Sequence, residues 1–379
     1  SIEDCIDAVD VETICILVGM MLLVAVIKNS GIFEYIAIKA AKIAKGRPWP
    51  IMVIFILITA VCSGMLDNVT TVLLVGPMTL AITNILKVDP VPYIITQIMA
   101  SNIGGTATLI GDPPNIMIGS AAKLSFVDFI LNTGVATVFV IIVGLICMYF
   151  IYGRKLFVTD ESIAKVMQLD ENKAIKDRKL MHESVIVIIL VALCFIFHDQ
   201  LGVQSCTVAI AAACIMLLIG GQEPEEIIAD VEWPTILFFI GLFIVVGGMK
   251  KVGVITMLAN GLISITHGNM VVTMMVILWV SAIVSSFLDN IPFVATLIPM
   301  ILTMQSEGMD VAPIWWALSL GACLGGNGTL IGASANVVLS GISKNNGHPI
   351  TFGQYFKIGF PMMILSIIVC SVFLLIRFT

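Results

Sequence analysis

The sequence has little charge for its length. Asp, Glu, Lys and Arg make up 12% of its 379 residues, whereas 59% are hydrophobic, and the mean hydropathy is +1.08. A soluble globule of this size needs far more polar surface. The formal charge of −6 is divided among separate loops, so it gives no support to a nucleic-acid partner. We therefore expect an all-α, multi-pass integral membrane protein.

The sequence also lacks the common motifs of catalysis and metal binding. It has no Walker sequence, no GxSxG and no metalloprotease spacing, so neither a nucleotide-driven pump nor a familiar hydrolase is expected. Its nine cysteines show no CxxC pattern, and we interpret them as small buried hydrophobes. No cleavable signal peptide is recognisable, and because the sequence begins at Ser1 we expect further residues before it. The protein is thus predicted not to be an enzyme and to need no cofactor beyond a coupling ion.

What the sequence does have is a glycine-rich interruption that occurs twice. Residues 104–115 read GGTATLIGDPPN, and residues 325–336 read GGNGTLIGASAN. The copies differ at Asp112 against Ala333 and at Thr106 against Asn327. Broken helices survive at membrane depth only where they line a cavity or are buried in protein, so the repeated break indicates a secondary transporter.

A second interruption is repeated 222 residues apart. Residues 63–71 read SGMLDNVTT, and residues 285–292 read SSFLDNIP. The apolar segment that enters the first copy has about 16 residues, or roughly 24 Å of helix against a hydrocarbon core of roughly 30 Å. We expect a re-entrant hairpin in each half, with its tip inside the membrane.

These repeats divide the chain into four predicted segments. They are a first repeat (residues 1–152), a polar loop (153–183), two linking spans (184–231, with a turn at 198–200) and a second repeat (232–379). Each repeat holds a span, a hairpin, a discontinuous helix and a last span, and residues 28–47 read as an amphipathic interfacial helix. Each repeat crosses the membrane three times, so the two are inverted relative to each other.

The charges predict which way the chain is inserted. Placing the polar loop in the cytoplasm puts 15 of the 19 Lys and Arg residues on that side. This arrangement follows the positive-inside rule. We expect residue 1 to lie outside.

Three acids in apolar surroundings are the leading candidates for chemistry: Asp67, Asp112 and Asp289. An ionised side chain at the bilayer centre costs about 2.5 to 3.5 kcal/mol on insertion scales, so each needs a partner, a proton or a bound cation. Asp67 and Asp289 can also cap the helix that follows each hairpin tip. We interpret them as serving both purposes.

Neutral groups complete the predicted site. Asn68 and Asn290 offer amides that can face an anion or a cation, whereas capping explains Asn115 and Asn336 equally well. The glycines of the breaks are predicted to offer unwound carbonyls to an ion, although close helix packing also explains them. The remaining candidates are Thr70, Thr108, Thr329, Asn327, Gly104, Gly105, Gly325 and Gly326. Na⁺ is expected at Asn68, Gly104, Asn290 and Gly325.

The motifs resemble those of a known family. Residues 66–71, 101–115, 289–293 and 321–336 closely resemble the permeases of the melanosomal P protein type, in the arsenite permease and NhaD-type antiporter branch of the ion transporter superfamily. The resemblance covers nearly the whole chain. It implies a fold similar to the sodium-coupled dicarboxylate transporters, with inverted repeats, an elevator-like movement and a homodimer.

The hairpin tips depart from the dicarboxylate pattern. Those relatives carry Ser-Asn-Thr, whereas the present triplets are Asp67-Asn68-Val69 and Asp289-Asn290-Ile291. Because two carboxylates would repel a dianion, we predict Na⁺ or other cation/H⁺ antiport in the plasma membrane. Na⁺- or H⁺-coupled transport of a small anion or neutral oxyacid, such as a dicarboxylate or arsenite, is the alternative. An anion channel is a further one.

Overall fold

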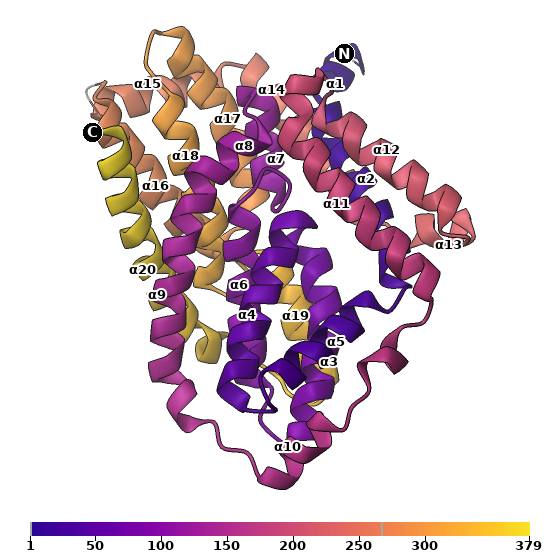
Figure 1. Ribbon diagram of the computed structural model, residues 1–379. Helices are drawn as coiled ribbons and strands as arrows, with labels where there is room; N and C mark the ends of the chain where they lie inside the picture. The colour runs from indigo at the N-terminus through magenta and orange to yellow at the C-terminus, as the bar shows by residue number, and fades with distance from the viewer. Residues whose placement is uncertain (1, 267) are drawn as a thin grey trace.

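The structure is a computed structural model that describes residues 2–266 and 268–379 (Figure 1). It is built from helices, and the described part contains no strand. The first repeat consists of α2 (Val11–Lys28), α3 (Ile32–Ile43), α4 (Pro48–Met65), α5 (Asn68–Leu86), α6 (Val91–Thr106), α7 (Pro113–Ala122), α8 (Phe126–Phe129), a π-helical turn η1 (Ile130–Gly134) and α9 (Val135–Ile151).

The long helices of the second repeat follow the same order. It consists of α14 (Trp233–Lys251), α15 (Val254–Thr266), α16 (Met270–Phe287), α17 (Asn290–Ser306), α18 (Ala312–Gly325), η4 (Gly326–Gly328), α19 (Ser334–Asn345) and α20 (Phe352–Phe378). The remaining elements precede the repeats or join them: α1 (Ile2–Ala8), η2 (Gly153–Lys155), α10 (Asp160–Met167), η3 (Glu171–Ala174), α11 (Arg178–Leu201), α12 (Ser205–Ile219) and α13 (Pro224–Ala229). The predicted turn at 198–200 is wrong, because α11 continues to Leu201. The predicted segment boundaries stay predictions.

The two repeats are inverted, as predicted. In Figure 1, α3 and α10 lie at one end of the molecule, here called the loop end, whereas α1 and α15 lie at the opposite end. The α4–α5 hairpin enters from the loop end and the α16–α17 hairpin from the opposite end (Figure 1). Both hairpins return to the side where they began. Eight described helices are long and apolar enough to cross a membrane, but the hairpin limbs α4, α5 and α16 are among them.

The polar loop is attached to the interfacial helix α3 at the loop end. Lys42 on α3 donates to Glu171 at 2.6 Å, and Lys176 lies 3.4 Å from Glu34. The hydrogen bond from Lys42 holds the pKa of the Glu171 carboxyl below its usual value. The first pair is partly buried and the second is exposed, so each contributes modestly to stability, but both join the loop to α3.

The breaks in the helices have a local cause. α6 runs through Thr106, and α7 starts only at Pro113, whose ring fixes φ for a first helical residue and whose nitrogen carries no hydrogen. Residues 107–112 between them are not helical. The break therefore begins after the paired glycines, so the expectation that Gly104 and Gly105 supply unwound backbone is wrong.

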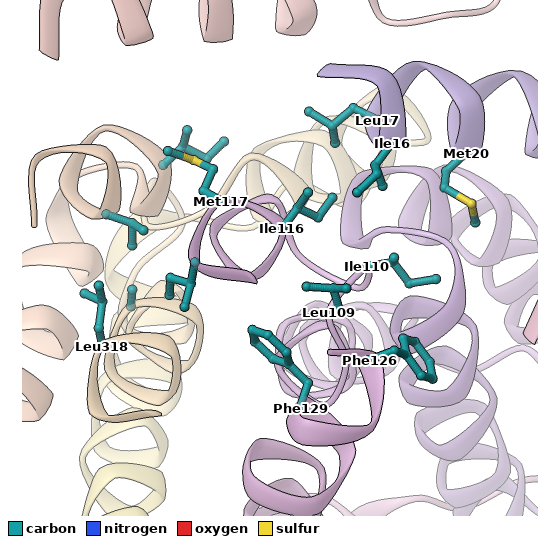
Figure 2. Close-up of a cluster of buried hydrophobic side chains, with 14 of the residues drawn as sticks. Ile16, Leu17, Met20, Leu109, Ile110, Ile116, Met117, Phe126, Phe129 and Leu318 are labelled. Carbon is teal, nitrogen blue, oxygen red and sulfur yellow. The ribbon is translucent and has the colours of Figure 1, made fainter. Parts of the chain in front are cut away.

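Apolar side chains surround the first break (Figure 2). Leu109 and Ile110 of the break and Ile116 of α7 belong to one buried cluster with Ile16 and Leu17 of α2. In this structure the packing holds the first broken helix against α2 and so places Asp112, which directly precedes α7.

Candidate functional site

The carboxylate of Asp112 lies between the two hairpin tips. Asn68 Nδ2 donates to Asp112 Oδ1 at 3.2 Å, and Asn290 Nδ2 lies 3.3 Å from Oδ2 and 3.4 Å from Oδ1. All three side chains are buried. Asn68 begins α5 and Asn290 begins α17, so two hairpins that enter from opposite ends meet at one acid.

The two other predicted acids cap the helices that follow the tips. Asp67 accepts from Thr70 N at 2.8 Å and from Thr70 Oγ1 at 2.5 Å. Asp289 accepts from Ile291 N at 3.2 Å and from Ser334 Oγ at 3.0 Å. Asp67 is buried, whereas Asp289 is only partly buried. Capping is thus present at both tips, but their surroundings differ.

A small cavity adjoins these groups. Its volume is about 30 Å³, enough for a water molecule or a bare cation. It is lined by Leu17, Met21, Asp67, Asn68, Val69, Asp112, Pro113, Glu232, Thr235, Asn290, Ile291 and Ser334. The lining thus contains three acids and, among the described residues, no basic side chain.

Glu232 is a cavity residue that the sequence analysis missed. It directly precedes α14, where its side chain makes no capping bond to the backbone but its Oε2 accepts from Thr235 Oγ1 at 3.2 Å. It is close enough to Asp67 to interact with it electrostatically. Its place in an acidic segment from Glu223 onward made it look like a solvated loop residue. The one signal in the sequence is the repeat, because Glu232 lies 222 residues after Asp10, an acid at the equivalent position before α2.

Asn115 and Asn336 close the two breaks. Asn115 Nδ2 donates to Thr108 O at 2.9 Å and to Thr106 O at 3.2 Å. Asn336 Nδ2 donates to Gly326 O at 2.7 Å and to Thr329 O at 2.8 Å. Neither side chain lines the cavity. These contacts favour a structural role, in which each amide replaces the missing helical bonds.

The amide oxygens of the same two residues tie the repeats together. Asn115 Oδ1 accepts from Ser319 Oγ of α18 at 2.6 Å. Asn336 Oδ1 accepts from Asn102 of α6 at 2.8 Å, and Asn102 also donates to Asn327 Oδ1 at 2.9 Å. Asn102 and Ser319 escaped notice in the sequence because they lie within helices that read as continuous apolar spans.

Each break is also tied to its own hairpin by a threonine. Thr108 Oγ1 donates to Gly64 O, and Thr329 Oγ1 donates to Ser286 O, both at 2.5 Å. Neither threonine lines the cavity. The pair is equivalent in the two repeats, so both hairpins are held to their broken helices in the same way.

The glycines allow close packing of the hairpins. A Cβ added at Gly104 would lie 2.1 Å from Ala60 O, and one at Gly325 would lie 2.6 Å from Ala282 O. Gly326 belongs to η4, so the expectation of unwound backbone at Gly325 and Gly326 is wrong as well. Of the four predicted Na⁺ ligands, the structure brings Asn68 and Asn290 together, whereas the two glycines do not line the cavity.

Comparison with known proteins agrees with this architecture. Residues 1–321 match the citrate transporter family, CitMHS. An uncharacterized transporter of Mycobacterium bovis is 42% identical over 98% of this chain and 87% of its own length. The P protein of Homo sapiens is 32% identical over 99% of this chain, which spans only 54% of that protein.

A solved structure shows the same fold. The YdaH transporter of Alcanivorax borkumensis superposes with a TM-score of 0.67 at 13% identity, covering 95% of this chain and 84% of that one. The predicted resemblance to P protein relatives and the predicted inverted-repeat fold are thereby confirmed. The chain is a multi-pass integral membrane transporter of the plasma membrane, and it belongs to the citrate transporter family.

Proposed function

We propose that this transporter exchanges Na⁺, or another small cation, for H⁺ at Asp112. The observation that carries the proposal is the buried Asp112 carboxylate, which two tip amides contact beside a cavity whose described lining residues include no basic side chain. An isolated carboxylate at membrane depth is unfavourable, so it favours a bound proton or a bound cation. Because both compete for one carboxylate, binding of one releases the other, which is the basis of exchange.

The surrounding acids support a cation over a large anion. Asp67 and Glu232 line the same cavity as Asp112, so a dianion there would meet three carboxylates. The cavity of about 30 Å³ also suits an ion better than a dicarboxylate. The coupling ion is therefore proposed to be H⁺, with Na⁺ as the exchanged cation.

The movement proposed for exchange is of the elevator type. Both hairpins and both broken helices are joined by Asp112 and by the contacts of Asn115 and Asn336, so they can move as one unit. That unit would carry the site past α2 and α14 in a homodimer, as the resemblance implies.

Exchange in proteoliposomes tests the proposal. Uptake of radiolabelled Na⁺ driven by an outward H⁺ gradient is measured for the wild type, Asp112→Asn, and the exposed control Glu307→Gln. We expect Asp112→Asn to reduce uptake to the level of empty liposomes and the control to keep it. Full, pH-dependent exchange by Asp112→Asn would overturn the proposed site.

A second candidate is cation-coupled transport of a small carboxylate or oxyacid, including citrate. It is favoured by the family, which is described as citrate transporters, and by two tip amides that can donate to an anion. Here the cation would neutralise the acids so that the anion can bind. Thermal stabilisation by citrate or arsenite only in the presence of Na⁺, without Na⁺/H⁺ exchange, would favour this candidate. Single-channel currents would instead indicate an anion channel.

A further inference from the structure

Equivalent residues of the two repeats differ sharply in burial. Ile110 and Ile116 of the first broken helix are 3% and 2% exposed. Their counterparts 221 residues later, Ile331 and Val337, are 53% and 52% exposed. The two copies keep apolar side chains at both positions. One copy of this surface is therefore covered, whereas the other is bare.

The covering element is α2. It packs against α7 through the cluster that includes Ile16 and Leu17 (Figure 2). At the outer end of this contact, Asp10 at the start of α2 accepts from Ser120 Oγ of α7 at 3.1 Å. In the second repeat, the counterpart of Ser120 is Gly341, where an added Cβ would meet nothing within 4 Å.

The acids that directly precede α2 and α14 therefore lie at different distances from the site along their helices. Asp10 and Glu232 are equivalent by sequence, and each faces a threonine three residues on, Thr13 at 2.7 Å and Thr235 at 3.2 Å. Yet Glu232 lines the cavity at the hairpin tips, whereas Asp10 contacts the far end of α7. The hairpins and broken helices are thus displaced toward the start of α14.

Inverted repeats can exchange their surroundings when a transporter changes state. If the displacement is reversed, α14 covers Ile331 and Val337 as α2 now covers Ile110 and Ile116. Glu232 then lies beside Gly341, and Asp10 reaches the hairpin tips.

We propose that Asp10 and Glu232 are alternating partners of the site, one on each side of the membrane. Glu232 faces the site in the present state, and Asp10 faces it in the opposite state. Each supplies the last carboxylate that a cation contacts as it enters or leaves on its side. This inference deepens the proposed cation exchange and rests on it for the chemistry, but the geometry can be tested without transport.

Disulfide cross-linking tests the geometry. Two pairs are compared in a background that keeps only the buried Cys323 and Cys370: Asp10→Cys with Ser120→Cys for the present state, and Glu232→Cys with Gly341→Cys for the opposite one. We expect each pair to form a disulfide within one chain under copper phenanthroline. The exposed control, Glu225→Cys with Gly341→Cys, should form none.

Two results would overturn the geometry. One is failure of the Glu232/Gly341 pair to cross-link while the Asp10/Ser120 pair does. The other is a disulfide at Gly341→Cys that joins two chains, since a second copy would then cover the bare surface. Neither readout depends on Na⁺/H⁺ exchange, so failure of the proposed function would be seen separately.

Single neutral substitutions test the chemistry. Glu232→Gln is expected to raise the half-saturating Na⁺ concentration on the side of the loop end on the order of tenfold, because the cation loses the attraction of one carboxylate that lines its cavity. Asp10→Asn should do so on the opposite side. The exposed controls Glu225→Gln and Asp7→Asn should leave both sides unchanged. Equal effects of Glu232→Gln on both sides, or none, would contradict the alternating role.

Discussion

At the scale of single residues, the hairpin tips of both repeats contact one acid, and it comes from the first repeat alone. Asp112 begins α7 and receives amides from both hairpin tips, whereas its counterpart Ala333 is a buried methyl group at the start of α19. An exact two-fold site would hold two such acids at once, and their mutual repulsion would be relieved by a proton on one and a cation on the other, so both could bind together. The loss of one acid therefore leaves a single position where proton and cation compete.

This asymmetry predicts unequal effects of substitution at Asp112 and Ala333. Asp112→Asn removes the carboxylate that both tip amides contact and should abolish H⁺-coupled Na⁺ uptake. Ala333→Ser changes a position without charge and removes no group that could hold a proton or a cation, so uptake should stay within about twofold, or about 0.4 kcal/mol. Initial rates at saturating Na⁺ measure both. Greater loss from Ala333→Ser than from Asp112→Asn would show that the second break holds the sensitive position.

The threonines of the breaks are predicted to act on stability. Thr108→Val and Thr329→Val each remove a hydroxyl that donates to a buried carbonyl of the neighbouring hairpin. Each should lower the free energy of unfolding by about 1 to 3 kcal/mol, because the carbonyl is left without its partner. Thermal unfolding in detergent measures the change. Thr303→Val is the control, since its hydroxyl bonds within its own helix at 2.9 Å, and it should be nearly neutral.

At the scale of elements, hairpins and breaks could be predicted because each interrupts an apolar run with residues that helices disfavour. Asp67 and Asp289 mark the tips, and Pro113 marks where α7 starts. Whether the paired glycines are helical or unwound could not be predicted in the same way. Glycine permits both unwound backbone and close packing, and only the neighbouring hairpin decides between them. Likewise, the position of Glu232 depends on how α14 lies against the hairpins, which no local pattern records.

The close packing of α4 against α6 predicts a strong dependence on Gly104. Gly104→Ala would place a methyl group 2.1 Å from the carbonyl oxygen of Ala60, a backbone atom that cannot turn aside. We expect Gly104→Ala to lower the free energy of unfolding by about 1 to 3 kcal/mol, the usual range for overpacking. Gly144→Ala in α9 is the matched control, because an added Cβ there meets nothing within 4 Å. Similar melting temperatures for the two variants would contradict this packing.

At the scale of the whole molecule, inverted repeats have two separate properties. One is which end faces the cytoplasm, and the other is toward which end the site is displaced in the structure. Sequence alone addresses the first, because loop charges follow the positive-inside rule. It is silent on the second, because the difference in burial between Ile116 and Val337 arises from the position of α2 and α14, and the two sequences are equally apolar there.

The orientation predicts how cysteines placed at the two ends will react. Phe157 lies in the loop between η2 and α10, at the loop end, and is 85% exposed, whereas the exposed Glu307 follows α17 at the opposite end. In intact cells, a membrane-impermeant maleimide should label Glu307→Cys but not Phe157→Cys, in a background without the other accessible cysteines. Permeabilised cells should show both. Labelling of Phe157→Cys in intact cells would show the reverse orientation, in which 15 of the 19 basic residues lie outside, against the positive-inside rule. It would also exchange the sides on which Asp10 and Glu232 are expected to act, while leaving their alternation intact.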